Sequence, residues 1–169
     1  MIFKTRPYMP LHVSKLIYST LIDSYLRYAI SSWGTAATYL KERLLSTQNR
    51  SVKTLLFPQF ATSSLSDHYK HLKVLCLNDL YTIEMAKFMH SIYYNYNPSS
   101  FDNLIDISDH KYSTRLRQNA HFALVRPRTE IGKRSVRYSG VKCWTNLPQN
   151  VKVIKNRKSF SSSLKQHLN

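Results

Sequence analysis

The sequence predicts a mainly α protein, in which a helical bundle is followed by a small, basic α+β segment that contains a hairpin. The first observation is that apolar residues in the front part of the chain recur at spacings of three and four, as in amphipathic helices. The second is that 43% of the 169 residues are hydrophobic, which is enough to form a core. The third is that this periodicity ends near residue 100. We therefore divide the chain into a lead-in (1–12), a helical region (13–100) and a basic region (101–169).

The front part of the chain contains recognisable helix starts and stops. Pro7 and Pro10 exclude regular helix from the lead-in, because proline lacks the amide hydrogen that a helix needs. Ser14, Thr38 and Asn78 precede apolar stripes and are candidate N-caps. The predicted helices of this region cover residues 14–30, 38–57, 66–73 and 79–96.

The back part reads differently. Phe122-Ala123-Leu124-Val125 and Ser135-Val136-Arg137-Tyr138 are candidate strands, and Gly132 lies between them, so we expect a hairpin. A short helical turn is predicted over residues 142–146. A last helix is predicted over residues 159–168, where apolar side chains recur four apart.

The positive charge is concentrated at the back of the chain. The net charge is +16, and residues 110–169 hold fourteen Lys or Arg against a single acid, Glu130. Residues 1–109 carry eleven Lys or Arg and eight acids, which is close to an ordinary globular surface. A strongly basic chain usually has a polyanionic partner, because its own like charges oppose compaction. This imbalance predicts nucleic acid as the partner.

Residues 110–148 combine cations, aromatic residues, glycine and proline, and we single them out as the nucleic-acid-binding tract. Phosphate contacts are predicted for Arg115, Arg117, Arg126, Arg128, Lys133, Arg134, Arg137 and Lys142. Tyr112, Tyr138 and Trp144 are candidates for stacking on bases. The alternative for Tyr138 and Trp144 is that they anchor the hairpin in the core, and for Trp144 this alternative is favoured.

The sequence contains no constellation typical of an active site. Its nine acids are dispersed, and the closest group, Asp102, Asp106 and Asp109, is more typical of a solvated loop than of a metal site. The seven histidines are scattered, and Cys143 has no CxxC partner. None of the three glycines lies in a phosphate-cradling motif. We therefore predict no catalytic residues, no metal and no cofactor.

The cysteine content and hydropathy bear on the compartment. Two cysteines, Cys76 and Cys143, fit a reducing environment and cannot form a disulfide framework. The first residues lack the apolar stretch of a signal peptide, and no apolar run approaches the roughly 20 residues that span a bilayer. We expect an intracellular protein, nuclear or cytoplasmic, that is neither secreted nor bound to a membrane.

Several short motifs also occur in a familiar order. Residues 16–34 read LIYSTLIDSYLRYAISSWG, residues 110–115 read HKYSTR, and residues 132–148 read GKRSVRYSGVKCWTNLP. Residues 44–55, 72–88 and 159–168 add three more segments to this order. The whole order resembles the C-terminal part of reverse transcriptases from non-LTR retrotransposons of the jockey-like kind. These retrotransposons are LINE-type transposable elements.

The resemblance implies a function in nucleic-acid binding. In that family the catalytic aspartates of the palm precede the region that this chain resembles, so the chain would be a helical, thumb-like fragment plus the basic segment that follows it. It would contact the backbone of RNA or of an RNA–DNA template–primer duplex and would have no catalytic centre of its own. The parent family is an RNA-directed DNA polymerase.

A second interpretation belongs to a different class. A truncated or repurposed copy would act as a protein-interaction module or have no function, because a detached thumb-like bundle exposes the apolar face that once packed on the palm. Its partner would be a polymerase palm or another protein. Leu16, Leu21, Tyr25 and Tyr28 are the candidate residues of that face.

Overall fold

The computed structural model of the chain describes residues 8–56, 63–101, 103–106 and 122–168. The described residues are mainly helical, which confirms the predicted fold class. In chain order the elements are α2 (Leu11–Tyr18), the π-helical turn η2 (Ser19–Asp23), α3 (Ser24–Arg27), α4 (Ile30–Trp33), α5 (Thr38–Leu56), α6 (Leu65–Leu72), α7 (Leu77–Tyr93), the 3₁₀ turn η3 (Ser99–Phe101), α8 (Glu130–Lys133), α9 (Val136–Thr145), α10 (Gln149–Lys152) and α11 (Arg157–Leu168).

The chain forms two compact units. Unit 1 comprises residues 1–30 and 36–81, and unit 2 comprises residues 31–35 and 82–169. Helix α7 crosses the division, because its first residues belong to unit 1 and the remainder to unit 2. Each unit is described by itself.

In unit 1, the first predicted helix is a succession of three segments. It begins at Leu11 directly after Pro10, which occupies the N-cap in an extended conformation. The Ser19 and Thr20 hydroxyls both donate to the Leu16 carbonyl, at 3.0 and 2.9 Å, and the backbone widens into the π-helical turn at this point. The helical path is interrupted at Ala29, whose φ of 49° lies in the left-handed region.

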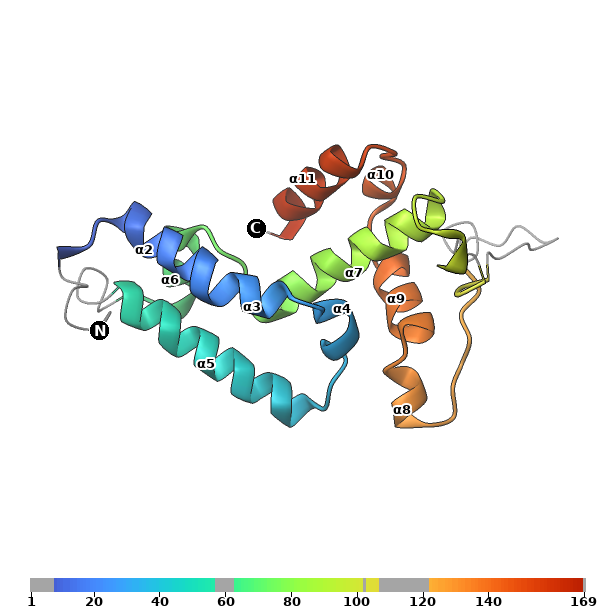
Figure 1. Ribbon diagram of the computed structural model, residues 1–169, viewed down its shortest axis with the longest axis horizontal. Coiled ribbons are helices and arrows are strands. Elements are labelled where there is room, and N and C mark those ends of the chain that lie inside the picture. The colour runs from blue at the N-terminus through green and yellow to red at the C-terminus, as the bar shows by residue number, and fades with distance from the viewer. Residues whose placement is uncertain (1–7, 57–62, 102, 107–121, 169) are drawn as a thin grey trace. The chain divides into compact units, whose positions relative to one another are not determined.

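The core of unit 1 lies between α2, α5 and α6, with α2 running alongside α5 (Figure 1). Tyr18, Val52, Leu55, Leu56 and Leu72 are buried there. Gln48, which is 2% exposed, lies among them. Its amide nitrogen donates to the Tyr18 hydroxyl at 2.6 Å and to the Leu75 carbonyl at 3.0 Å, while its oxygen accepts from the Leu77 amide at 2.9 Å. This side chain therefore ties α5 to α2 and to the start of α7.

Helix α6 has well-defined ends. Ser64 caps it through a capping box in which the Ser64 and Asp67 side chains each accept a bond from the other's backbone amide. At the other end, Lys73 adopts the left-handed conformation with φ 52°. The predicted helix over residues 66–73 is therefore present, one residue earlier in the chain.

The core of unit 2 is aromatic. Trp144 is fully buried and lies within about 6 Å, between ring centroids, of Tyr93 (5.7 Å), Phe122 (5.9 Å) and Phe160 (6.1 Å). Gly140 permits α9 to approach α7 closely, since a Cβ atom at this position would lie 2.7 Å from the sulfur of Met89. Trp144 and Gly140 lie four residues apart, on the buried face of α9.

The predicted hairpin is wrong. Ser135 is the N-cap of α9, and Val136 to Tyr138 form the first turn of that helix rather than a strand. The predicted turn over residues 142–146 is the end of the same helix. Phe122 to Val125 form no strand within the described residues; the Ala123 amide donates to the Asp106 carbonyl at 2.8 Å. A short alternating run does not distinguish strand from helix, and here the packing of the Gly140 face on α7 decides in favour of helix.

The last predicted helix is present and begins two residues earlier than expected, at Arg157. The Asn156 side chain accepts from the amides of Lys158 (2.9 Å) and Ser159 (3.3 Å) and so caps α11. Throughout the described part of the chain, every helix falls short of the length or the apolar character that crossing a bilayer requires.

Candidate nucleic-acid interface

The described cations of the predicted tract lie in unit 2, before and along two short helices. Arg126 and Arg128 precede α8, Lys133 and Arg134 end it, and Arg137 lies in the first turn of α9. Lys142 lies further along α9. All six side chains are exposed. Arg115, Arg117 and Tyr112 lie outside the described residues.

The only acid of this region lies beside one of these cations. The Glu130 carboxylate accepts from the Lys133 ammonium, three residues later in α8. This pairing lowers the pKa of Glu130 and raises the pKa of Lys133, because the hydrogen bond, and then the opposite charge, stabilises the charged form of each group. No carboxylate in the described part of the chain lies within salt-bridge distance of the other five, which are Arg126, Arg128, Arg134, Arg137 and Lys142.

The position of Arg137 is electrostatically unfavourable within the fold. It lies in the first turn of α9, which contains no acid. The N-terminal end of a helix carries a partial positive charge, and a cation there destabilises by a few tenths of a kcal/mol. A bound anion would offset this repulsion. The charge at the first turn of α9 therefore favours the protein with an anion bound over the protein without one.

The two described stacking candidates differ in exposure. Trp144 is 0% exposed and packs among aromatic rings, so it is unable to stack on a base. Of the two alternatives for Trp144, the position in the core is therefore confirmed. Its position on the inner face of α9 results from the helical path that replaced the predicted hairpin. Tyr138, on the same helix, is partly exposed and stays a candidate.

One basic residue of the back region is structural. Lys152 is 2% exposed, and its ammonium donates to the Thr145 carbonyl at the end of α9, at 3.1 Å. Burial lowers the pKa of this lysine, because the charged form is poorly solvated. A cation at the C-terminal end of a helix is favourable, so Lys152 stabilises the junction between α9 and α10.

The thiols are not activated as nucleophiles. Burial raises the pKa of Cys143 to about 11, and its sulfur lies 3.7 Å from the Thr82 carbonyl. Burial also raises the pKa of Cys76, whose thiol donates to the Asp79 carboxylate at 2.9 Å. Within the described ranges, no group of three or more metal-binding side chains forms a metal site.

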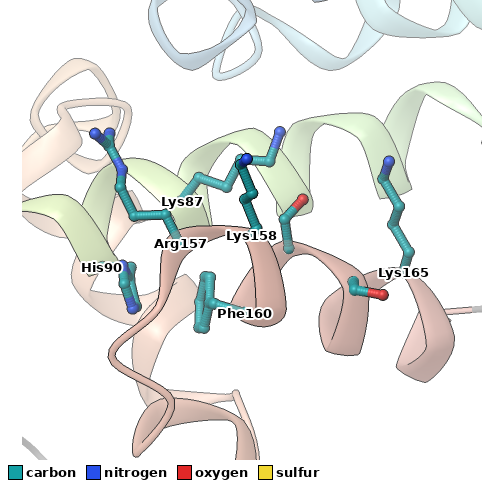
Figure 2. A pocket seen from close by; sticks show the side chains of 8 residues that line it. Lys87, His90, Arg157, Lys158, Phe160 and Lys165 are labelled. Atoms are coloured by element: carbon teal, nitrogen blue, oxygen red, sulfur yellow. The ribbon is translucent and has the colours of Figure 1, made fainter.

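A second group of cations was not predicted as a site. Lys87 of α7 and Arg157, Lys158 and Lys165 of α11 line one open groove with a volume of about 470 Å³ (Figure 2). Sequence reasoning overlooked them, because α7 and α11 are far apart in the chain and their packing is a tertiary property. The sequence feature that could have indicated this group is the series of Lys and Arg residues near the C-terminus, from Lys152 to Lys165.

Unit 1 exposes the apolar residues predicted for its outer face. Leu16, Leu21, Tyr25 and Tyr28 are 61, 56, 78 and 80% exposed. They project from α2, η2 and the end of α3, and none belongs to the core between α2, α5 and α6. An exposed apolar group of this size on a helical surface is typical of an interaction site.

Comparisons with known proteins identify no relative: no family model matches the chain, and no curated protein or solved structure matches it.

Proposed function

We propose that this protein binds nucleic acid through the backbone phosphates, using the exposed cations of unit 2 that lie before α8 and along α9. The resemblance to the thumb and post-polymerase part of a LINE-type reverse transcriptase supports RNA or an RNA–DNA template–primer duplex as the ligand. In this proposal the chain holds the duplex and contributes no catalytic group.

The observation that carries the proposal is the lack of compensating acid. Residues 122–168 contain eleven Lys or Arg and one acid, and that acid is already paired with Lys133. Five exposed cations of the tract therefore have no carboxylate within salt-bridge distance in the described part of the chain, and one of them, Arg137, opposes the dipole of its own helix. Such a surface attracts a polyanion, and each phosphate contact releases counterions from the nucleic acid.

Binding without sequence preference is expected. The proposed contacts are to phosphates, which carry no sequence information, and Trp144 is buried away from any base. With roughly six to eight phosphate contacts on a duplex, the logarithm of the affinity falls with the logarithm of the salt concentration at a slope of about −5 to −7.

The test is fluorescence anisotropy with a labelled primer–template duplex at several salt concentrations. A quadruple variant replaces four exposed arginines by glutamate: Arg126, Arg128, Arg134 and Arg137. We expect this variant to lose binding while its helical content by circular dichroism stays unchanged. Binding that survives in the variant removes the tract from the proposal.

A charge-matched control separates a specific surface from net charge. It replaces four exposed cations of unit 1 by glutamate: Lys15, Arg43, Lys53 and Lys70. Its net charge equals that of the quadruple arginine variant. We expect it to keep most of the affinity, and an equal loss in both variants indicates that net charge alone drives binding.

The exposed apolar residues of unit 1 favour a second candidate function, protein interaction. Changing Leu16, Leu21, Tyr25 and Tyr28 to serine removes the apolar surface without touching the unit 1 core. If this face holds a partner or a second copy, the wild-type chain is oligomeric by light scattering or binds an apolar dye, and the variant does neither. A monomeric wild-type chain that does not bind the dye contradicts this second candidate.

A further inference from the structure

The groove between α7 and α11 differs from the basic tract in its construction. Lys87 and His90 come from α7, and the remaining lining residues come from α11. These are Arg157, Lys158, Phe160, Ser161, Ser162 and Lys165. Both walls lie within unit 2, and the groove shares no residue with the tract.

The floor of the groove is closed by two rings. His90 and Phe160 stack with their centroids 4.1 Å apart and their planes inclined by 28°, and both are 1% exposed. The His90 ring nitrogen Nε2 donates to the Ile154 carbonyl at 2.7 Å, which fixes the ring. Because both rings are buried, neither of them offers a surface on which a nucleobase could stack.

The rim of the groove is basic. In the view of Figure 2, the charged ends of Lys87, Arg157, Lys158 and Lys165 extend to the same side of the two helices, away from the stacked rings. One acid compensates part of this charge, since the Glu84 carboxylate lies 2.8 Å from the Lys87 ammonium. Lys158 and Lys165 have no carboxylate within salt-bridge distance in the described part of the chain. The rim therefore keeps an excess of positive charge.

Arg157 is held in position at the mouth of the groove. Its guanidinium donates to the Ser91 hydroxyl at 2.8 Å and lies 5.8 Å from the centre of the Tyr96 ring. Two contacts leave several of the five guanidinium N–H donors available. Arg157 and Lys158 also lie in the first turn of α11, where two cations oppose the helix dipole. The amides of Lys158 and Ser159 are already bound to Asn156, so the ligand would contact side chains rather than the backbone.

The spacing along α11 indicates the length of the ligand. Lys158, Ser161, Ser162 and Lys165 occur at i, i+3, i+4 and i+7, which places them on one face of the helix. Seven residues correspond to about 10 Å at 1.5 Å per residue. The row formed by these four side chains is therefore longer than one phosphate group. Each strand of a DNA duplex advances about 3.4 Å along the helix axis per nucleotide, so about three nucleotide steps match the length of the row.

From this geometry we propose that the α7–α11 groove is a second anion site, which holds a run of consecutive phosphates without reading the bases. The lysines and Arg157 contact phosphate oxygens, and the serine hydroxyls donate further hydrogen bonds. A nucleic-acid backbone and a linear polyphosphate share this chemistry. The site does not depend on the tract before α8 and along α9, because the two share no side chain.

The test replaces Lys158 and Lys165 by glutamine and measures binding of a labelled single-stranded oligonucleotide by anisotropy. Two lost phosphate contacts lower the magnitude of the salt slope by about 1.4 and weaken binding about 25-fold at 0.1 M salt. The matched control replaces two other exposed lysines by glutamine, Lys53 and Lys155. Both lie outside the groove and the tract. An equal change in slope in both double variants overturns the proposal.

Calorimetry distinguishes the sources of the phosphates. Tripolyphosphate should bind the wild-type chain more tightly than orthophosphate does, and this binding should be lost in the Lys158→Gln, Lys165→Gln variant. If tripolyphosphate binding depends on the two lysines but oligonucleotide binding does not, the natural ligand of the groove is a polyphosphate. Orthophosphate that binds as tightly as tripolyphosphate contradicts a site for consecutive phosphates.

The two proposals fail separately. Loss of oligonucleotide binding in the lysine variant, with full binding in the quadruple arginine variant, supports the groove and contradicts the tract. The opposite result supports the tract and contradicts the groove.

Discussion

Unit 1 and unit 2 are both small helical assemblies, but they bury and expose different kinds of side chain. Unit 1 buries mainly aliphatic residues around the hydrogen-bonded Gln48 and exposes apolar residues along α2 and η2. Unit 2 buries a cluster of aromatic rings around Trp144 and exposes cations with little compensating acid. One chain therefore carries two surfaces of different character, an apolar one on unit 1 and a cationic one on unit 2.

The largest expected effect tests the aromatic core. Changing Trp144 to Ala removes a fully buried ring that contacts three others, and we expect a loss of about 3–5 kcal/mol in the free energy of unfolding. Hydrogen exchange measured by mass spectrometry should show lost protection in α9 and α11. Trp144→Phe serves as the milder control. An equal loss of protection in α5 would contradict a core that belongs to unit 2.

The second effect tests the polar centre of unit 1. Changing Gln48 to Ala leaves the Leu77 amide, the Leu75 carbonyl and the Tyr18 hydroxyl without their partner, at a cost of about 2–3 kcal/mol. Denaturant unfolding measures this cost, and hydrogen exchange should place the loss of protection in α2 and α5. Thr47→Ala, at the neighbouring exposed position, should change the free energy by less than about 0.5 kcal/mol. Similar losses in the free energy of unfolding for both variants would contradict a stabilising role for Gln48.

The third effect concerns pH and unit 2. Burial lowers the pKa of His90 below its ordinary value of 6.5, with a smaller contribution in the same direction from Arg157. The unfolded chain therefore binds a proton more readily than the folded chain, so stability is full above about pH 6.5 and decreases as the pH falls below it.

Thermal unfolding between pH 8 and pH 5, followed by tryptophan fluorescence, measures this loss, since both tryptophans belong to unit 2. His90→Gln keeps a donor for the Ile154 carbonyl but does not titrate. We expect the variant to lose less stability than the wild type as the pH falls. Parallel curves for the two proteins would exclude His90 as the cause.

The smallest effect is a stabilisation within unit 1. Lys73 ends α6 with φ 52°, a conformation that glycine adopts without strain. We expect Lys73→Gly to stabilise by about 0.5–1 kcal/mol. The control is Lys70→Gly inside the same helix, which should destabilise by about 1 kcal/mol. Thermal unfolding of both variants compares them directly, and a shift of the same sign in both would contradict the assignment of a left-handed cap.

Several helices could be predicted from the sequence because their signals are local. The helix predicted over residues 38–57 is α5, Thr38–Leu56, and the one predicted over residues 79–96 is α7, Leu77–Tyr93. Apolar periodicity and stop signals such as Pro58 depend only on near neighbours in the chain. The boundaries moved by one to three residues, because the final turns depend on packing and capping.

The candidate site was predictable in composition but not in arrangement. The excess of Lys and Arg after residue 110 is visible in the sequence, and the exposure of Arg126, Arg128 and Arg137 agrees with a charged surface. That Lys152 is buried is not visible, because its role depends on the position of the Thr145 carbonyl. The pairing of Glu130 with Lys133 depends likewise on the short helix α8.

Local patterns in the sequence were enough to predict the helical class, the positions of the long helices and the basic character of the second half. These properties follow from local periodicity and from net charge, which no packing alters. Packing between elements distant in the chain makes residues 136–138 helical and buries Trp144. It alone brought Lys87 and Arg157 to one groove. The physical reason is that burial and side-chain proximity depend on contacts between elements distant in sequence, and a linear pattern does not contain them.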